Sequence, residues 1–281
     1  MPETAHPTGT FATHREDRWW HYPASILFIL SGFVFYATFR ILEAQFLGAQ
    51  FIIDGGSSAV VAATGSAAGY HYLSPFGTPD LTFLVPPFLL SIPFFGQFLA
   101  NPAAVILPFP AGFRFTCYYY RKAYYRAFVA RPAACGTEAW KGREYQGEKR
   151  LMIFQNIHRY FLYAALVITV FLAYDAARSI YTPHGWYLGI GSVIMVVNVA
   201  LLTGYTLGCH SLRHLTGGRL DCYSCDAVSM SQHGIWSGLS KLNTKHGFWA
   251  MASLFSVALT DLYIRWVGAH PGITHVLGVP V

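Results

Sequence analysis

The stretch Trp186–Leu207, WYLGIGSVIMVVNVALLTGYTL, runs for 22 residues without one charged side chain. A helix of about 20 mostly apolar residues is long enough to cross the hydrocarbon core of a bilayer. Three further stretches of this kind occur in the chain, at Ala24–Phe46, Ile157–Ala177 and Phe248–Val267. The sequence therefore predicts an all-α membrane protein.

The composition of the whole chain agrees with a membrane environment. Of 281 residues, 54% are hydrophobic, 17% are aromatic and only 11% are charged, whereas about a quarter of the residues in a soluble domain carry charge. So few charges cannot cover the surface of a soluble protein of this size, and the aromatic content excludes a disordered chain. The net charge of +6 is explained by the topology of the loops, so we predict no nucleic-acid partner.

A fifth crossing is predicted at Ala103–Tyr120. This segment contains Pro108, Pro110 and Arg114, so we expect a kinked helix that packs among the others and does not face lipid. The preceding apolar stretch, Leu81–Phe98, contains three prolines, each of which lacks a backbone donor. We expect that stretch to form a buried or interfacial re-entrant element.

The positions of the Lys and Arg residues predict the orientation. Two lie before the first span, eight across Arg121–Arg150 and four across Arg213–Lys245, whereas Ile41–Gly112 contains none. With five crossings these basic segments fall on one side, which the positive-inside rule assigns to the cytoplasm. We predict one transmembrane domain over residues 1–281, with a cytoplasmic tail at residues 1–23. A long extracytoplasmic loop follows the first helix, and the C-terminus is extracytoplasmic.

One predicted cytoplasmic loop, residues 208–226, is rich in metal-ligating side chains; it reads GCHSLRHLTGGRLDCYSCD. His210 and His214 are four residues apart, so both project from one face of a continuing helix. Cys222 and Cys225 form a CxxC pair, and we expect no disulfide between them because cytoplasmic thiols are kept reduced. We predict that these four residues bind a metal, with Cys209 as an alternative ligand.

Two Cys and two His side chains suit two kinds of metal centre. One is a structural zinc ion with tetrahedral coordination. The other is a Rieske-type [2Fe–2S] cluster, in which imidazoles in place of two thiolates raise the reduction potential. The spacing does not distinguish them. Cys117 and Cys135 are interpreted as small apolar side chains that serve packing.

Several segments together resemble one family. They are CHSLRHLTGGRLDCYSC at 209–225, FQNIHRYFLY at 154–163, SKLNTKHGFWAMASLFSVALTDLYIR at 240–265, RWWHYPASILFILSGFVFYATFR at 18–40 and CYYYRKAYYRAF at 117–128. They resemble the single-chain, five-helix membrane anchor of a bacterial succinate dehydrogenase, respiratory complex II. The branch in question holds a Rieske-type cluster in its anchor instead of haem.

The resemblance implies a multi-pass protein of the bacterial cytoplasmic membrane. Its expected partners are the iron–sulfur and flavoprotein subunits and membrane lipid, and the complex can form a higher-order oligomer. Its expected function is to pass electrons from the iron–sulfur subunit through the cluster to menaquinone or ubiquinone. The flavin chemistry belongs to a partner subunit, because this chain has no dinucleotide-binding fingerprint.

A quinone site needs an apolar slot with a few polar groups that hydrogen-bond the carbonyls and supply protons. The candidates lie near the cytoplasmic ends of the spans: Trp20, His21, His158, Arg159, Lys241 and His246. Interfacial aromatic belts use the same residue types. One alternative to the cluster is a haem b held between His158 and His246, in a cytochrome-type anchor.

Four charged residues, Arg40, Asp175, Asp261 and Arg265, fall near the outer ends of the predicted spans. Charges inside spans are costly and usually paired. The spacings Arg40–Glu43 and Asp261–Arg265 fit pairing within each helix. We expect a structural ion-pair layer, with a second quinone site or a proton route as the alternative.

Overall fold

The computed structural model describes residues 9–47, 60–62, 71–140, 151–182, 185–269 and 278–280. In this part of the chain four helices are long and apolar enough to cross a membrane. They are α1 (His21–Leu47), α8 (Leu151–Ile180), α9 (Ile190–Leu207) and α12 (His246–Ala269). The four clearest spans of the sequence analysis are thereby confirmed as helices.

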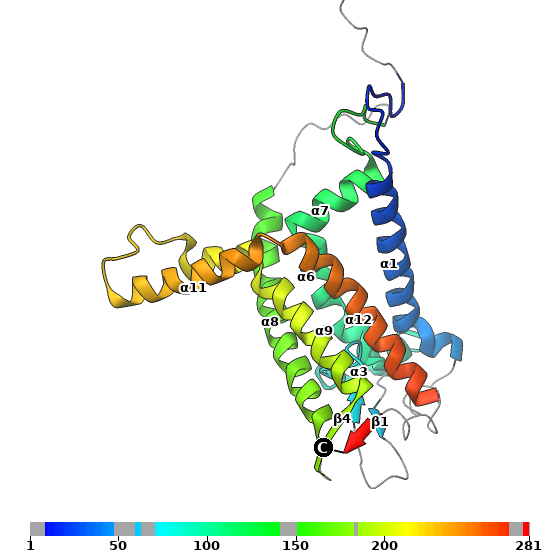
Figure 1. Cartoon of the computed structure of the whole chain (residues 1–281). Coiled ribbons are helices and arrows are strands. Elements are labelled where there is room, and N and C mark those ends of the chain that lie inside the picture. Colours follow the sequence, from blue (N-terminus) through cyan, green and yellow to red (C-terminus); the bar gives the residue numbers. More distant parts are fainter. Residues whose placement is uncertain are drawn as a thin grey trace, which may run out of the picture.

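Helices α8, α9 and α12 form the centre of the molecule, with α9 in contact with both of the others. Helix α1 stands beside them (Figure 1). It contacts α7 and η2 near one end and α4 and α5 near the other.

The predicted fifth crossing is a series of short helices. It consists of α5 (Pro102–Ile106), α6 (Pro108–Thr116) and α7 (Tyr118–Tyr124), followed by the π-helical turn η2 (Tyr125–Val129). Pro102 and Pro108 each occupy a first helical position, where the missing N–H costs nothing. Cys117 interrupts the path with an extended conformation, φ −62° and ψ 130°. The expected kink is therefore a complete break at Cys117, whereas Leu107, between α5 and α6, keeps helical dihedral angles.

The segment between α1 and α5 contains β1 (Val60–Ala62), β2 (His71–Leu73), η1 (Thr82–Leu84), α3 (Pro87–Leu90) and α4 (Phe95–Ala100). Strands β1 and β2 pair antiparallel. Phe83, Phe88 and Phe94 are exposed. The described helices of this segment have at most six residues, which is too short for a helix to cross a bilayer. The interfacial re-entrant element stays a prediction.

The prediction of a purely α-helical chain is corrected by small sheets. Beside the β1–β2 pair, β3 (Tyr181–Thr182), β4 (Gly185–Gly189) and β5 (Gly278–Pro280) form an antiparallel sheet in the order β3-β4-β5. Helix α9 begins only at Ile190, because the preceding residues pair with strands on both sides. The predicted start of that span at Trp186 is therefore wrong by four residues.

The sequence analysis did not predict α11 (Ala227–Asn243), which follows α10 (His210–Arg213) and the π-helical turn η3 (His214–Gly218). Helix α11 projects sideways from the end of the bundle at which α1 begins (Figure 1). The Asp226 carboxylate caps its N-terminus by accepting a 2.8 Å hydrogen bond from the Ser229 amide. Arg213 attaches its last turn, donating to Ser240 at 3.0 Å and to Asn243 at 2.9 Å.

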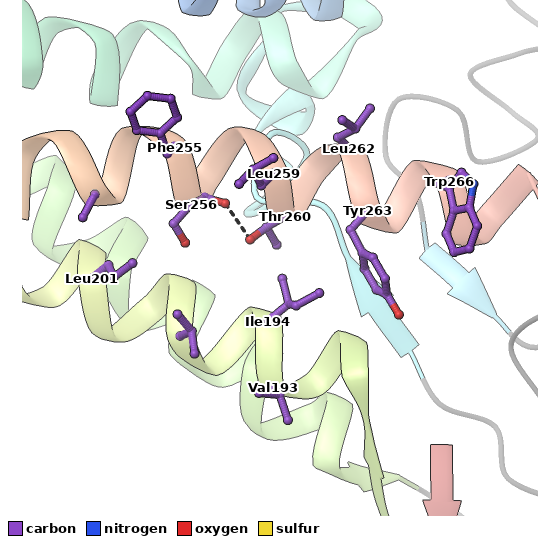
Figure 2. A pocket seen from close by; sticks show the side chains of 12 residues that line it. Val193, Ile194, Leu201, Phe255, Ser256, Leu259, Thr260, Leu262, Tyr263 and Trp266 are labelled. Carbon is purple, nitrogen blue, oxygen red and sulfur yellow. Dashed lines mark hydrogen bonds between the residues drawn. The ribbon is translucent and has the colours of Figure 1, made fainter. Parts of the chain in front are cut away.

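The outward faces of α9 and α12 form a shallow groove of about 780 Å³ (Figure 2). The Thr260 hydroxyl donates to the Ser256 carbonyl at 2.7 Å, and the Ser256 hydroxyl donates to Asn198 at 3.0 Å. Most other lining side chains are apolar, among them Val193, Ile194, Leu201, Phe255 and Leu259. This surface is suited to lipid acyl chains, since its hydroxyl protons bond within the protein.

Candidate metal centre

Two thiols and two imidazoles from four segments meet where α9 ends and α12 begins. Cys117 separates α6 from α7, His158 lies in α8, Cys209 precedes α10, and His246 begins α12. The His158 Nε2 atom lies 3.2 Å from the Cys209 sulfur, and the His246 Nε2 atom lies 3.6 Å from the Cys117 sulfur. We call these residues the Cys/His quartet.

The same backbone feature positions both thiols. Cys117 has φ −62° and ψ 130°, and Cys209 has φ −65° and ψ 134°. Each is the extended residue immediately before a short helix, and each is at least 97% buried. Two helix breaks of matching geometry thus place the thiols inside the bundle.

Thr116 fixes the tautomer of His158. The Thr116 hydroxyl donates its only proton to the Gly112 carbonyl at 2.7 Å and lies 2.9 Å from His158 Nδ1. Because that proton is already used, the hydroxyl oxygen accepts from an Nδ1–H group on His158. The lone pair of the neutral ring is then on Nε2, which faces Cys209. An imidazole binds a metal through a nitrogen that carries a lone pair, while its other nitrogen donates its proton to a neighbouring group.

Several buried polar atoms beside the quartet lack a hydrogen-bond partner among the described residues. They are His246 Nδ1, the Tyr205 hydroxyl and Trp249 Nε1. The Tyr205 ring stacks on His246 with centroids 5.1 Å apart. Buried polar atoms are rarely left unpaired, so their grouping indicates that this region binds a further group.

The Cys209 thiol is neutral unless a cation is present. Burial and, to a smaller extent, the neighbouring Cys117 raise the pKa of this thiol to about 11. A bound metal replaces thiol protons with its own positive charge. The chemistry of the donor set, two thiols with two neutral imidazoles, therefore fits a metal centre.

The predicted ligand set His210, His214, Cys222 and Cys225 is not assembled. Cys222 and Cys225 form a disulfide with their Cα atoms 5.8 Å apart, a separation that suits a bridge. Both histidines are exposed. Across the described residues, no three Cys, His, Asp or Glu side chains surround a single ion position. The expectation that this CxxC pair carries no bridge is also corrected.

The candidate quinone residues do not form one site. His158 and His246 belong to the quartet. Trp20 and His21 contact each other edge to face at 4.1 Å on the exposed start of α1, and Lys241 is exposed on α11. Arg159 is half-buried, and its Nε atom has no hydrogen-bond partner within the described chain.

Two of the four charged residues near the other ends of the spans form a buried pair that the sequence analysis did not predict. Arg40 of α1 binds Asp261 of α12 at 2.7 Å, and both side chains are fully buried. Tyr36 and Ser74 also donate to Asp261. The pair therefore joins two helices. Asp175 is buried in α8, and the side chain of Glu43 lies outside the described set.

The sequence analysis missed Cys117 and Cys209 as partners of the two histidines. Cys117 was assigned to packing, and Cys209 was only an alternative ligand. The signal was nevertheless present, because each of four predicted span ends on the cytoplasmic side carries one Cys or His within a few residues. The local CxxC motif obscured this long-range pattern.

The comparisons with known proteins agree with the membrane-helical fold. The family model described as "Actinobacterial succinate dehydrogenase subunit SdhC" matches residues 46–270. A solved chain of the Mycobacterium smegmatis Sdh1 complex in the apo form is 40% identical, with a TM-score of 0.69, and the match covers 92% of this chain and 90% of that one. No curated protein sequence matches. The chain therefore belongs to the actinobacterial SdhC family of succinate dehydrogenase membrane subunits.

Proposed function

We propose that this chain anchors the iron–sulfur and flavoprotein subunits of succinate dehydrogenase to the cytoplasmic membrane and relays their electrons to a membrane quinone. The relay we propose is a Rieske-type [2Fe–2S] cluster held by the Cys/His quartet. The observation that carries the proposal is the meeting of the buried residues Cys117, His158 and Cys209 with the partly buried His246.

The proposed topology has five crossings, with the N-terminus in the cytoplasm. The N-terminal tail contacts the loop that follows η2: Thr13 forms a bridge with Thr137, and the Arg15 guanidinium donates to the Cys135 carbonyl at 2.7 Å. The chain between them must therefore cross an even number of times. Helix α1 supplies one crossing, and the series from α5 to α7 supplies the return.

The quartet suits a binuclear cluster, which Cys117, Cys209, His158 and His246 would hold as its four protein ligands. Such a cluster, when bound, accepts and passes on one electron at a time at a higher potential than a four-thiolate cluster. Thr116 holds His158 in the ligating tautomer. The Phe113 ring stacks on His158 at 4.7 Å and, with Tyr205, keeps water away.

Two alternatives fit the geometry less well. A haem between His158 and His246 would have to displace Phe113 and Tyr205, which stack directly on the two imidazoles. A single zinc ion needs several ligands around one position, and no such group exists in the described part of the chain. Two irons with two protein ligands each avoid that requirement.

The test uses the purified complex reduced with succinate. Electron paramagnetic resonance is expected to show a signal with a Rieske-like average g value, and metal analysis is expected to give two irons beyond those of the partner subunit. Stoichiometric zinc without this extra iron would contradict the cluster. Haem absorbance that disappears in a His246→Ala variant would support the cytochrome instead.

A further inference from the structure

A pocket of about 650 Å³ lies between α8 and the segment that follows β2. On the α8 side it is lined by Val170, Phe171 and Tyr174, all of which are exposed. Two carboxylates, those of Asp80 and Asp175, also line it. We propose that this pocket binds a phospholipid whose headgroup carries a primary ammonium. The ammonium donates to the Asp175 carboxylate, and the acyl chains lie along α8.

Asp175 is the residue that points to a cationic ligand. Its side chain is only 5% exposed. The Thr78 hydroxyl is a neighbour of the carboxylate, but the Oδ2 atom of Asp175 has no hydrogen-bond partner among the described residues. A buried carboxylate is costly unless it is paired and hydrogen-bonded. Because Asp175 lines the pocket, a cation bound there can supply the missing partner.

The chain itself provides no counter-charge for Asp175. The segment Ile41–Gly112, which forms one wall of the pocket, contains no Lys or Arg. The ion pairs within the described part of the chain do not include Asp175, since Arg40 pairs with Asp261. Arg178 is exposed and is not among the residues that line the pocket. The positive charge that matches this carboxylate therefore comes from outside the chain.

The wall opposite α8 is held in place by its own hydrogen bonds. The Ser74 hydroxyl donates to Asp261 and accepts from the Phe76 amide at 3.1 Å. Further along, the Asp80 carboxylate accepts from the Thr82 amide at 2.9 Å and from the Thr82 hydroxyl at 2.7 Å. These bonds fix Asp80 at the rim, so the pocket is formed before a ligand enters.

The pocket lies at the depth of lipid headgroups. Helix α8 contributes a span of 28 residues, Ile153–Ile180, whereas about 20 suffice to cross the hydrocarbon core. Asp175 is five residues from the end of this span, at the end of α8 that lies away from α11 (Figure 1). An ammonium headgroup at this depth reaches the carboxylate while its acyl chains remain in the hydrocarbon.

A divalent metal ion fits this pocket less well than an ammonium. Mg²⁺ and Ca²⁺ take six or more oxygen ligands, and no group of three Cys, His, Asp or Glu side chains suited to an ion occurs in the described ranges. An ammonium has three N–H donors and needs only a few acceptors. The apolar and aromatic wall of α8 suits acyl chains and gives a metal ion nothing to bind.

The groove between α9 and α12 provides an internal comparison (Figure 2). It is also lined mainly by apolar side chains, but none of its lining residues is charged. Its Thr260 and Ser256 hydroxyls donate within the protein. We therefore expect the groove to accept acyl chains of any phospholipid, whereas the pocket beside Asp175 selects the headgroup.

The first test uses the wild-type complex, labelled with a photoreactive phosphatidylethanolamine. Labels are expected on peptides containing residues 73–80 and 170–175. Unlabelled phosphatidylethanolamine should suppress them at a concentration on the order of tenfold below that of phosphatidylglycerol with the same acyl chains, since hydrogen bonds to charged groups contribute about this factor. Equal suppression by the two lipids, or labels confined to residues 193–201 and 252–266, would overturn the proposal.

The same assay distinguishes a lipid ammonium from an inorganic cation. Neither MgCl₂ nor NaCl at equal ionic strength is expected to suppress the label. Suppression by MgCl₂ alone would show that the pocket binds a metal ion and would overturn the lipid assignment.

The second test removes the carboxylate charge while keeping the shape of the side chain. Asp175→Asn is expected to lose the preference for phosphatidylethanolamine over phosphatidylglycerol. The matched Asp221→Asn, exposed in the loop before α11, is expected to retain it. Succinate oxidation with a water-soluble dye should persist in both variants, which shows that the complex is assembled. An unchanged lipid preference in Asp175→Asn would contradict the role of this carboxylate.

Discussion

At the scale of single residues, the account depends on Thr116 as much as on the ligands. Its hydroxyl bonds His158 Nδ1 at 2.9 Å and uses its proton on Gly112. Thr116→Val removes the acceptor, and loss of such an outer partner typically costs 10- to 100-fold in metal affinity. We expect less iron per complex and a weaker Rieske signal, with recovery in Thr116→Ser.

The control for Thr116→Val is Thr260→Val. Thr260 is equally buried, but its hydroxyl donates only to the Ser256 carbonyl of its own helix. The complex with Thr260→Val should therefore retain its iron. Equal iron loss in both variants would indicate a general packing effect and contradict the role assigned to Thr116.

The sequence predicted a site of two Cys and two His in one loop, and the structure brings together two Cys and two His of which none belongs to that predicted set of four. The members differ because Cys117 and Cys209 meet only when two helix breaks, 92 positions apart, come together in the bundle. No spacing rule connects residues at that separation, whereas Cys222 and Cys225 look paired from the sequence alone.

At the scale of elements, the buried pair Arg40–Asp261 joins α1 to α12. Asp261→Asn removes the carboxylate charge that faces the buried Arg40 guanidinium, and breaking a buried ion pair typically costs about 3–5 kcal/mol. We expect a markedly lower thermal midpoint for the complex, with partial recovery when Arg40→Met is added. The control Asp226→Asn retains a good helix cap and should leave the thermal midpoint unchanged. An unchanged thermal midpoint in Asp261→Asn would show that the Arg40–Asp261 pair does not stabilise the packing of α1 against α12.

Close approach of α6 to α8 depends on Gly112. A Cβ atom there would lie 2.3 Å from the Phe161 ring, whereas one at Gly32 of α1 would meet nothing within 4 Å. Overpacking of this kind costs about 1–3 kcal/mol. Gly112→Ala should therefore broaden or weaken the cluster signal by moving Thr116 away from His158, while Gly32→Ala leaves it unchanged. Identical spectra for the two variants would contradict this explanation.

The elements that the sequence predicted well are those that depend on length and apolarity alone, such as α8 and α9. Helix α11 was missed because its sequence, AVSMSQHGIWSGLSKLN, is mostly small and polar, and tertiary bonds from Arg213 hold it. Strand β4 was read as the start of a span because its residues are mostly apolar. In the structure these residues pair with β3 and β5 instead of joining the helix. Neither partner strand is visible in the local pattern.

At the scale of the whole molecule, the positions of the Lys and Arg residues predicted that the N-terminal tail and the loop after η2 lie on the same side of the membrane. The contacts between the tail and this loop support that prediction. The tail and the loop after η2 touch through Ala12, Thr13 and Arg15, so two distant basic segments share one side. We expect alkaline phosphatase fused to the C-terminus of the chain to be active outside the cytoplasm, with a fluorescent-protein fusion dark there. The opposite pattern would rule out five crossings.

The most direct measurement compares two pairs of cysteine variants by electron paramagnetic resonance of the succinate-reduced complex. Cys117→Ser and Cys209→Ser are expected to abolish the Rieske signal and the extra iron, because each removes a ligand of the quartet. Cys222→Ser and Cys225→Ser, which open only a disulfide in the loop before α11, are expected to retain both. Loss of the signal in the second pair and its survival in the first would contradict the account.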